Sequence, residues 1–505
     1  MKRQQRVGKS MRRTTLRGLA CAAVLLSLPV LVGRGQNLQS GQVAATPGAP
    51  PRDPARELAL KVTAPFTLAS VGDVIIRRPA STLEDPAFQS ALKMIRDADI
   101  GIGNMEGNLS DIPRFDGPLR GMMGVKDVAA DLKKMGFKMM NRANNHIFDS
   151  DREGMITTDT LLDEAGIVHA GTGKNLEDAR APVFLDTPKG RIGLVAMHTP
   201  NGDPARQAAS AQSGNTGGRP GLNALRYTTY HIVTQEQFDA IKKIRAAAMT
   251  APPGTSNPTR LSNNDPTDRV TLFDVSYKVG KGAGTKSFEM NKDDLTGILR
   301  SIKDGKFFSD FMIATIHSHQ GPIEAQEWLF EDQVPDFLTD LAHQAIDNGA
   351  DAFVGHGPHV LRGVEIYKGK PIFYGLGEFF REWHYDAMLS GTFWANPTVG
   401  DDRSDPARVS AGYQAVNYES MIALSRYDKG QLVEVRLYPT DGRFDGPASS
   451  LGIPRTAPPA IATRILTRVQ TLSKAFGTTV AIEGNVGVIR VAPGTTTSSN
   501  SSASR

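Results

Sequence analysis

The sequence predicts an α/β protein built around a parallel β-sheet, and two observations lead to this prediction. Short apolar segments alternate with helix-like segments along most of the chain, as in repeated βα units. Polar residues follow directly after several of the apolar segments, where parallel sheets place their ligand sites. With 40% hydrophobic and 22% charged residues among 505, the composition is that of a globular protein and excludes collagen-like, wholly disordered and multi-span membrane classes.

The strands and helices are predicted in chain order from about residue 65 to residue 445. A linker rich in Gly, Pro, Gln and Ala precedes them over residues 34–64. Helices are indicated by apolar residues that recur near one helical face, and one of them closes at Gly349. The predicted strands are 66–71, 100–103, 137–140, 192–196, 312–316 and 352–354, and the predicted helices are 86–97, 153–165 and 334–348.

Two segments interrupt the alternation. Residues 202–310 hold many Gly, Pro, Asn and Ser residues and are predicted to form an insertion on the core. Residues 446–494 are predicted to form an extension with one amphipathic helix and a hairpin turning near Gly484. The Thr/Ser-rich residues 495–505 are expected to be disordered. The apolar positions of the predicted C-terminal helix are Ile461, Ile465, Val469 and Leu472.

Residues 1–33 have the pattern of an export signal. Basic residues up to Arg17 precede an apolar run over 19–32, which is too short to span a bilayer. Arg12 and Arg13 resemble a twin-arginine signal, and an ordinary secretory leader is the alternative. We expect an exported protein, periplasmic or extracellular, with an uncleaved N-terminal membrane anchor as the alternative. Cys21, the single cysteine, lies in this run, so the mature chain would have no disulfide and no thiolate metal site.

The positive charge of the chain belongs to this leader. The whole chain has a formal net charge of +5, and residues 1–35 contain eight Lys or Arg and no Asp or Glu. Without them the charge is −3, so the composition does not support nucleic-acid binding. We therefore expect no nucleic-acid partner.

Several of the polar residues near predicted strand ends could bind metal ions. Carboxylate, amide and imidazole groups together form the mixed oxygen and nitrogen set that binds Mn, Fe or Zn as a pair, with one carboxylate shared. Such a pair lowers the pKa of water and holds substrate oxygens, while a nearby histidine can protonate a leaving group. Each motif alone also fits a turn or helix cap, and only their number and order favour a site. The candidate segments are Gly72-Asp73, Asn104-Met105-Glu106-Gly107, Asn144-Asn145-His146, His317-Ser318-His319-Gln320-Gly321 and Gly355-His356-Gly357-Pro358-His359.

The last two histidines are predicted to lie on a loop. Gly355, Gly357 and Pro358 surround them and exclude a regular helix, so they are not part of the apolar stripe of a core helix.

This order of motifs resembles the CapA, or poly-γ-glutamate capsule biosynthesis, family, which has a metallophosphoesterase-like fold. The resemblance covers roughly residues 66–201 and 312–439, and it implies a four-layer αββα sandwich. The matching segments are Gly72-Asp73-Val74, Asn104-Met105-Glu106-Gly107, residues 143–149, 154–166, 218–223, 355–360 and 372–379.

The resemblance implies roles for particular residues. His146 would be the general acid beside a pair of divalent metal ions, oriented by Asp149. The implied ligands are Asp73 and His359 for the first metal, Asn145, His319 and His356 for the second, and Glu106 as the carboxylate that bridges both.

The chain departs from the related patterns at three positions. Full metallophosphoesterases have a histidine where this chain has Ile75. Without that ligand, a protein with one metal ion or without catalytic activity is an alternative. CapA-like sequences usually have histidine and asparagine where this chain has Gly357 and Glu378. Glu378 either adds a carboxylate near the cluster or lies on the surface at a strand end.

Two functions follow as expectations. The first is an exported CapA-like protein of poly-γ-glutamate or capsular polymer biosynthesis or export, whose metal pair hydrolyses a phosphoester or an amide-type bond. Its substrate would be an anionic polymer or a phosphoester. The alternative is a non-catalytic envelope scaffold or binding subunit of a membrane polymer-synthesis complex, and a plain extracellular binding module would need no metal.

Overall fold

The computed structural model describes residues 60–111, 122–200, 207–248, 267–323, 331–382, 415–444 and 450–491. The predicted export signal, nearly all of the linker and the predicted disordered tail lie outside these residues. Among the helices that the structure describes, none is both long enough and apolar enough to cross a membrane.

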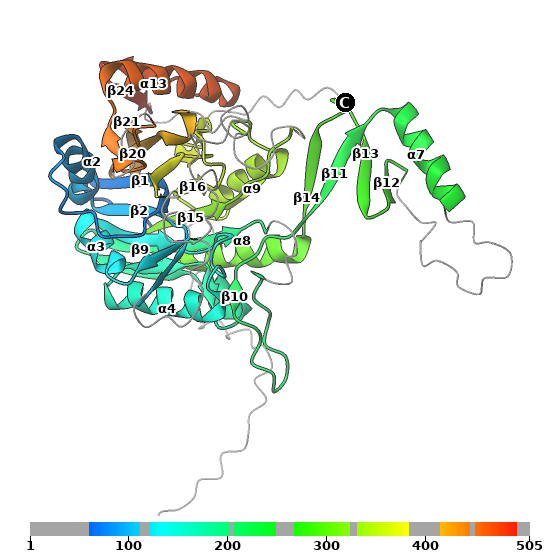
Figure 1. Cartoon of the computed structure of the whole chain (residues 1–505), viewed down its shortest axis with the longest axis horizontal. Helices are drawn as coiled ribbons and strands as arrows, with labels where there is room; N and C mark the ends of the chain where they lie inside the picture. The colour runs from blue at the N-terminus through cyan, green and yellow to red at the C-terminus, as the bar shows by residue number, and fades with distance from the viewer. Residues whose placement is uncertain are drawn as a thin grey trace, which may run out of the picture. The chain divides into compact units, whose positions relative to one another are not determined.

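The larger of the two main sheets has ten strands and is mixed (Figure 1). Strand β1 pairs with β2 and β19 in parallel and with β20 antiparallel. It therefore joins the parallel and antiparallel parts of the sheet. The parallel strands are β1 (Phe66–Ile75), β2 (Ile100–Met105), β5 (Phe137–Asn141), β6 (Val168–Ala170) and β19 (Glu378–Arg381). The antiparallel strands are β20 (Glu419–Asp428), β21 (Gln431–Asp441), β22 (Arg455–Thr456), β23 (Ala481–Glu483) and β24 (Val486–Arg490).

The second main sheet has six strands, of which the four central ones are parallel. These are β9 (Gly190–His198), β15 (Phe311–His317), β16 (Ala352–His356) and β18 (Lys370–Phe373). The edge strands are β8 (Val183–Thr187) and β17 (Val364–Tyr367), both antiparallel to their neighbours.

The main core lies between these two sheets, and each sheet also buries its other face. On β1, Phe66 and Leu68 belong to the core cluster between the sheets, whereas Val71 belongs to the cluster beneath helices. On β15, Ile313 faces the first cluster and Met312 a third one. The second cluster includes residues of α2 (Pro86–Asp97) and α3 (Val128–Met135), and the third includes residues of α8 (Lys292–Phe307) and α9 (Asp336–Asp347). Burial on both faces explains why the strands read as nearly continuous apolar runs.

Helix α2 has the bounds that the sequence predicts. Its N-cap, Asp85, accepts hydrogen bonds from the backbone N–H groups of Ala87 and Phe88, and Pro86 occupies the first turn. Phe88, Leu92 and Ile95 are buried at helical spacing, so one apolar face packs on the sheet.

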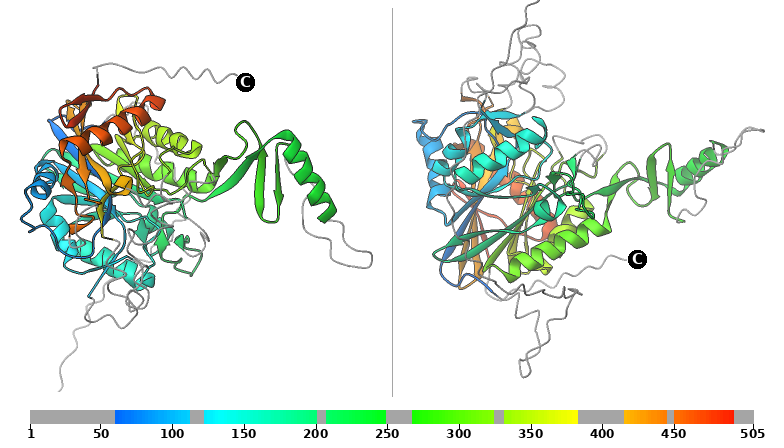
Figure 2. Two further views of the ribbon diagram at one scale, coloured as in Figure 1. Left: turned by 45° about the horizontal axis from the view of Figure 1, so that its top comes forward. Right: turned by 90° about the horizontal axis from the view of Figure 1, so that it is seen from below.

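The predicted insertion at 202–310 contains more ordered structure than its composition indicates. Helix α8 lies within this range, and its Ile298 and Ile302 are buried against the six-stranded sheet. A separate four-stranded sheet precedes it, with α7 (Gln235–Ala248) against two of its strands (Figure 2, green). We call the described residues 227–248 and 267–290 the accessory sheet. Its strands are β11 (Tyr227–Val233), β12 (Arg269–Leu272), β13 (Val275–Val279) and β14 (Lys286–Met290). Gly and Pro mark the turns of this segment but do not reveal which of its apolar residues join the core.

The predicted C-terminal extension forms as a helix and a hairpin, and it joins the main sheet. The helix is α13 (Pro459–Ser473), in which Ile465 and Val469 are buried in the core between the sheets. The hairpin is β23–β24, and β24 pairs with β21. The remaining elements are β3 (Asn108–Ser110), β4 (Met123–Val125), α4 (Asp151–Glu164), β7 (Thr172–Gly173), α5 (Leu176–Arg180), β10 (Gly221–Leu222), η3 (Ala415–Tyr418) and η5 (Lys474–Phe476).

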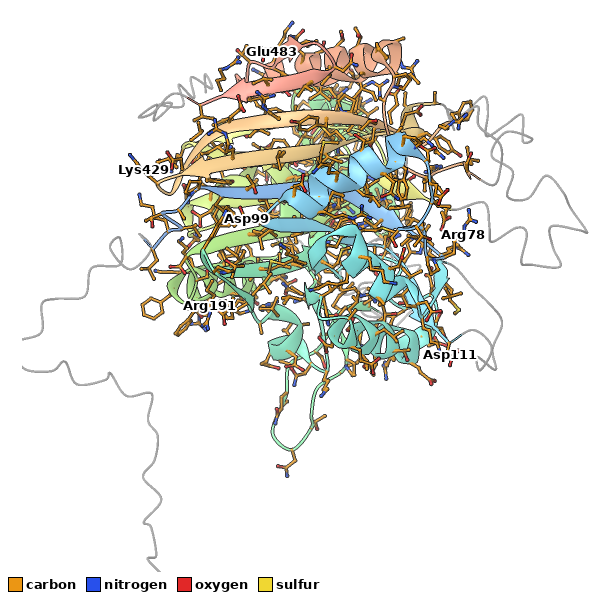
Figure 3. The ribbon with its side chains drawn as sticks, turned by 90° about the vertical axis from the view of Figure 1, so that its left-hand side faces the viewer. Arg78, Asp99, Asp111, Arg191, Lys429 and Glu483 are labelled. Atoms are coloured by element: carbon orange, nitrogen blue, oxygen red, sulfur yellow. The ribbon has the colours of Figure 1, made fainter. Side chains whose placement is uncertain are left out.

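The carboxyl ends of the parallel strands in the two sheets lie at the same side of the molecule. In Figure 3, Arg78, which follows β1, lies at the opposite end of the sheets from Asp99, which precedes β2. Arg191, at the beginning of β9, lies at the same end as Asp99. Side chains that follow β1, β2, β9, β15 and β16 can therefore converge, as expected for an α/β ligand site.

Candidate metal centre

Histidines end three neighbouring strands of the six-stranded sheet. His198, His317 and His356 are the last residues of β9, β15 and β16, and the strand register pairs His317 with each of the other two. The prediction that His356 lies on a loop is therefore wrong, because Gly355 pairs with Ile316 and continues the strand. The prediction is right for His359, which lies on the turn after β16 with a left-handed backbone (φ 57°).

Two glycines allow the backbone to bring Asp73 into the site. A Cβ on Gly72 would lie 1.8 Å from the carbonyl oxygen of Gly377, and the Asp73 N–H donates to that same oxygen at 3.0 Å. Gly357 has φ 107°, and a Cβ there would lie 2.8 Å from the backbone nitrogen of Ser318. Side chains at these two positions would push apart the strands that carry the candidate ligands.

Asp73 is fully buried and well supplied with hydrogen-bond donors. Its Oδ1 accepts from Asn104 Nδ2 at 2.8 Å, and its Oδ2 accepts from the Gly357 N–H at 3.2 Å. The Nδ1 atoms of His317 and His359 lie 3.7 and 3.4 Å from its carboxylate oxygens. Burial alone would raise the pKa of Asp73, but its contacts with these two histidines hold that pKa well below the usual value.

Glu106 has the opposite environment. Both of its carboxylate oxygens are buried and have no hydrogen-bond partner among the described residues. Three imidazole nitrogens lie near Glu106 Oε1. They are Nε2 of His146 and Nε2 of His317, both at 3.7 Å, and Nε2 of His359 at 4.0 Å. Burial and then the negative charge of Asp73 raise the pKa of Glu106 well above its usual value. A buried carboxylate without donors is costly unless a cation compensates it.

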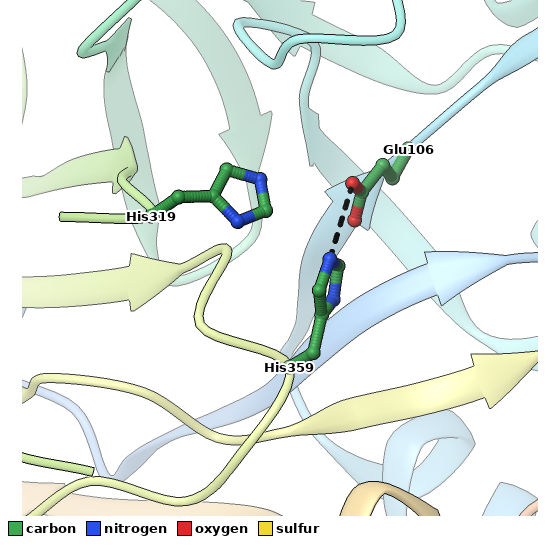
Figure 4. A group of neighbouring side chains, drawn as sticks. All are labelled: Glu106, His319 and His359. Carbon is green, nitrogen blue, oxygen red and sulfur yellow. Dashed lines mark ion pairs between the residues drawn. The ribbon is translucent and has the colours of Figure 1, made fainter. Parts of the chain in front are cut away.

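Glu106 belongs to two groups of side chains that could each hold a metal ion. One contains His319 and His359 (Figure 4), and the other contains Asp73 and His317. Within each group one ligand atom per residue lies within 4.8 Å of the others. Asn145 Oδ1 lies 3.4 Å from His319 Nε2, so the predicted amide ligand is beside the first of these groups. A carboxylate shared by two groups fits the bridging role expected of Glu106.

His356 lies beside Asp73, with Nδ1 3.8 Å from Oδ1. Neither of its ring nitrogens has a hydrogen-bond partner within the described ranges, and burial lowers its pKa to about 4. The resemblance implies a place on the second metal with His319, whereas this geometry puts His356 on the Asp73 side. Neutral imidazoles and carboxylates with unpaired buried atoms are the donors that Zn, Mn and Fe bind, so the residues present fit a divalent metal pair.

His146 lies next to these groups, and its imidazole contacts Asp149. His146 Nδ1 and Asp149 Oδ2 are 2.6 Å apart, and the same oxygen accepts from the Met122 N–H at 2.7 Å. The His146 side chain is 18% exposed, whereas that of Glu106 is completely buried. His146 therefore lies between the buried carboxylates and solvent, where a proton donor to a substrate would need to be.

Sequence reasoning placed His317 in a polar motif at a strand end without giving it a role, and it did not single out His198. Both directly follow buried apolar runs, and this position at a strand end is the signal that could have identified them. The His198 Nδ1–H donates to the carbonyl oxygen of His317 at 2.8 Å, because a carbonyl can only accept. Burial, and secondarily His317, hold the pKa of His198 well below its usual value.

Glu378 also belongs to the site rather than to the surface. It is the first residue of β19, and the strand register places it opposite Asp73. Its side chain is buried, with Oε1 2.6 Å from His359 Nδ1 and Oε2 paired with Arg381. This contact decides between the two expectations for Glu378.

Comparison with known proteins agrees with the resemblance seen in the sequence. The model of a family described as the bacterial capsule synthesis protein PGA_cap matches residues 67–382, which is more than half of the chain. This chain belongs to the PGA_cap family. The match includes all the candidate ligands, and the resemblance to CapA proteins is confirmed.

Individual relatives support the same assignment. An uncharacterized protein of Sinorhizobium fredii is 38% identical over 451 residues, which cover 84% of this chain and 93% of the relative. The PGA biosynthesis protein CapA of Bacillus subtilis is 40% identical over 317 residues, 61% of each chain. The capsule biosynthesis protein CapA of Bacillus anthracis is 23% identical over 324 residues, 62% of this chain and 59% of the relative. This PGA_cap protein is thus related to proteins of poly-γ-glutamate capsule biosynthesis.

Proposed function

We propose that this PGA_cap protein is an exported, metal-dependent hydrolase that acts in the biosynthesis or export of poly-γ-glutamate or a similar anionic polymer. Glu106 is the observation that carries the proposal: a buried carboxylate whose oxygens accept no hydrogen bond from the described residues, shared by two groups of side chains that could hold a metal ion. A folded protein retains such a group when a cation neutralises it. The capsule-related family supports the polymer and the envelope location.

The proposed ligands form two sets around Glu106. A pair of Mn, Fe or Zn ions would supply Lewis acidity and neutralise charge on the oxygens of a phosphoester or amide substrate. His359 lies between the sets, 3.4 Å from Asp73 and 4.0 Å from Glu106. The sets are Asp73, His317 and His356 on one side, and His319 and Asn145 on the other.

His146 is the proposed proton donor. Asp149 accepts from Nδ1, which leaves Nε2 directed toward the Glu106 side of the site. An imidazolium held by a carboxylate in this way can give its Nε2 proton to a leaving oxygen or nitrogen.

The proposal extends to the fold and the location of the chain. Two sheets that pack face to face with helices on their outer faces support a four-layer αββα sandwich. The basic and apolar leader at 1–33 supports export, and a membrane polymer-synthesis complex is the proposed partner.

Metal content tests the proposal. We expect about two equivalents of metal per chain by elemental analysis, and fewer than one in Glu106→Gln, which keeps the side-chain size but removes the charge. Glu365→Gln is the matched control, because Glu365 is buried on β17 with His343 and Tyr374 as its partners. It should retain the metal.

Turnover separates the hydrolase from the scaffold. With a panel of phosphoesters and γ-glutamyl polymers, we expect hydrolysis by the metal-loaded protein and its loss in His146→Ala with the metal retained. Two equivalents of metal without any hydrolysis would support the non-catalytic scaffold instead, for which Ile75 in place of a histidine is the supporting observation. A protein without metal would contradict the metal centre itself.

A further inference from the structure

We propose that Glu378 is a positioning residue of this centre, which holds the imidazole of His359 by Nδ1 so that Nε2 faces Glu106. This inference rests on the proposed metal centre and deepens it. It assigns a function to a buried carboxylate that the predicted ligand set does not include.

Glu378 makes a close contact with His359. Glu378 Oε1 lies 2.6 Å from Nδ1, and the two side chains are 0% and 1% exposed. Asp73 Oδ2 lies 3.4 Å from the same nitrogen and already accepts from the Gly357 N–H. Glu378 therefore makes the closer ion-pair contact with Nδ1, a contact that does not meet hydrogen-bond geometry in the part of the chain that the structure describes. With Nδ1 turned toward Glu378, Nε2 lies on the far side of the ring.

The far side of the ring faces Glu106. His359 Nε2 lies 4.0 Å from Glu106 Oε1, in the group that also includes His319 (Figure 4). The geometry thus forms a series from Glu378 through the imidazole to the shared carboxylate. Histidines that bind metals commonly donate their other N–H to a carboxylate in this way.

Glu378 is itself held in place. Its second oxygen pairs with Arg381, three residues further along β19. The Arg381 guanidinium lies 5.1 Å above the ring centre of Tyr418, and its backbone N–H donates to Gly452 at 2.9 Å. With both oxygens engaged, Glu378 offers His359 one fixed acceptor.

The backbone of His359 has an uncommon conformation. Its φ of 57° lies in the left-handed region, which residues with side chains seldom adopt. The register that pairs Asp73 with Glu378 brings both carboxylates to the same edge of the ring. Between them they determine which way this imidazole turns.

Zinc affinity of the full chain tests the proposal, measured by competition with a chromophoric chelator. We expect Glu378→Ala to weaken Zn²⁺ binding about 10- to 100-fold while the number of ions at saturation stays the same. Glu378→Gln keeps an acceptor oxygen and should recover most of this affinity. Glu365→Gln and Glu365→Ala, at a buried glutamate on another strand, should bind as the unaltered protein does.

Three results would overturn the proposal. Unchanged affinity in Glu378→Ala would show that His359 needs no such support. Loss of one zinc equivalent in Glu378→Gln would make Glu378 a direct ligand, and equal loss of affinity in Gln and Ala would exclude positioning through the side-chain oxygen that contacts Nδ1. An unaltered protein that binds none of Zn²⁺, Mn²⁺ and Fe²⁺ would instead refute the proposed function, so the two failures are distinguishable.

A second variant covers the risk that Glu378→Ala does not fold, because it leaves Arg381 buried without its partner. Glu378→Ala combined with Arg381→Met removes both charges together. It should melt cooperatively and still show the 10- to 100-fold weaker zinc binding, and a folded double variant with full affinity would contradict the inference.

Discussion

Asp73 and Glu106 are neighbouring buried carboxylates whose pKa values are shifted in opposite directions. Donors surround Asp73, which lowers its pKa, whereas the oxygens of Glu106 have no donors among the described residues and its pKa is raised. Without a cation, the negative charge is therefore favoured on Asp73 over Glu106. Two carboxylates with separated pKa values mark a functional site more than a structural ion pair does.

His198 provides a test of the electrostatics beside the centre. Its pKa is well below the usual value of about 6.5 because it is buried and lies near His317. Below about pH 6.5 the unfolded chain binds a proton at this residue that the folded chain does not. The free energy of unfolding therefore decreases as the pH is lowered through this range. The contribution reaches at most about 1.4 kcal/mol per pH unit. In His198→Asn, whose amide can still donate to the His317 carbonyl, urea unfolding of metal-free protein should show a correspondingly shallower slope between pH 5 and 6.5.

Higher pH provides the internal control for His198. Above about pH 8 the residue is neutral in both the folded and the unfolded chain, so the two stability curves should run parallel there. Curves that are parallel from pH 5 upward would mean that His198 takes up a proton as easily inside the protein as outside it.

Most of the site's carboxylates were predictable from the sequence, but the partners of each residue were not. Asp73 and Glu106 follow short apolar segments within recognisable motifs, and His146 with Asp149 are three residues apart. The closeness of His317 and Glu378 to Asp73 could be seen only in the structure. His317 belongs to the other sheet, and Glu378 belongs to a strand about 300 residues away from Asp73 in sequence. Proximity of this kind leaves no local pattern.

At the scale of elements, Arg142 connects the two turns that carry Glu106 and His146. It is fully buried after β5, and its Nη1 donates to the carbonyl oxygens of Met105 at 3.0 Å and Gly107 at 2.7 Å, on either side of Glu106. Its Nε pairs with Asp159 of α4 at 3.0 Å. One guanidinium thus holds the β2–β3 turn against the turn after β5.

Arg142→Lys tests this connection. A lysine ammonium cannot reproduce the fork that bonds two carbonyls and Asp159 together, so at least one buried acceptor loses its donor. We expect a loss of about 1–3 kcal/mol in unfolding free energy, measured with urea, and weaker Zn²⁺ binding because Glu106 is less well placed.

Arg96→Lys is the matched control for this substitution. Arg96 also donates to a backbone carbonyl, that of Lys134 at 2.9 Å, but on an exposed surface of α2. Its replacement should change stability by less than about 0.5 kcal/mol. If Arg142→Lys were equally mild and bound zinc normally, the turn that carries Glu106 would not depend on Arg142.

Element positions were predicted better where one face of the element is polar. Helix α2 combines a capping aspartate, a proline in the first turn and a clear apolar face, and its predicted bounds agree with the structure. Helix α8 lies within a segment rich in turn residues, and its buried residues Ile298 and Ile302 did not distinguish it from an insertion. Local signals identify an element, whereas its packing partner depends on the tertiary structure.

At the scale of the whole molecule, the division into two sheets was not predictable from the strands. Successive residues of β15 are all buried, with Ile313 in one core cluster and Met312 and Ala314 in another. Because both faces are apolar, the strand pattern does not state which face meets the other sheet. The α/β class was predictable because it depends only on alternation, and the finer arrangement came from the family resemblance.

The accessory sheet is predicted to be separable from the two-sheet core. Ile232 and Thr285 are cross-strand neighbours, and the Ile232 N–H donates to the Thr285 carbonyl oxygen at 2.8 Å. An Asn-Gly turn between these two residues can therefore replace residues 233–284 and keep the base of the β11–β14 hairpin. At that base, Tyr227 and Phe288 pack against Phe337 of α9. We expect the shortened chain to melt within about 5 °C of the full chain and to bind zinc with the same stoichiometry.

Phe288→Ala in the full chain is the contrasting variant, since it removes a buried ring that contacts α9 and Tyr227. It should lower the unfolding free energy by about 3 kcal/mol, because a large core side chain leaves a cavity. The base of the accessory sheet, unlike residues 233–284, would then contribute to the stability of the core. The opposite result would be a shortened chain that aggregates or loses zinc, together with a Phe288→Ala variant whose unfolding free energy is nearly unchanged. This result would reverse the assignment of stability to the base of the accessory sheet. The stability of the core and the proposed metal centre would then depend on the segment that was removed.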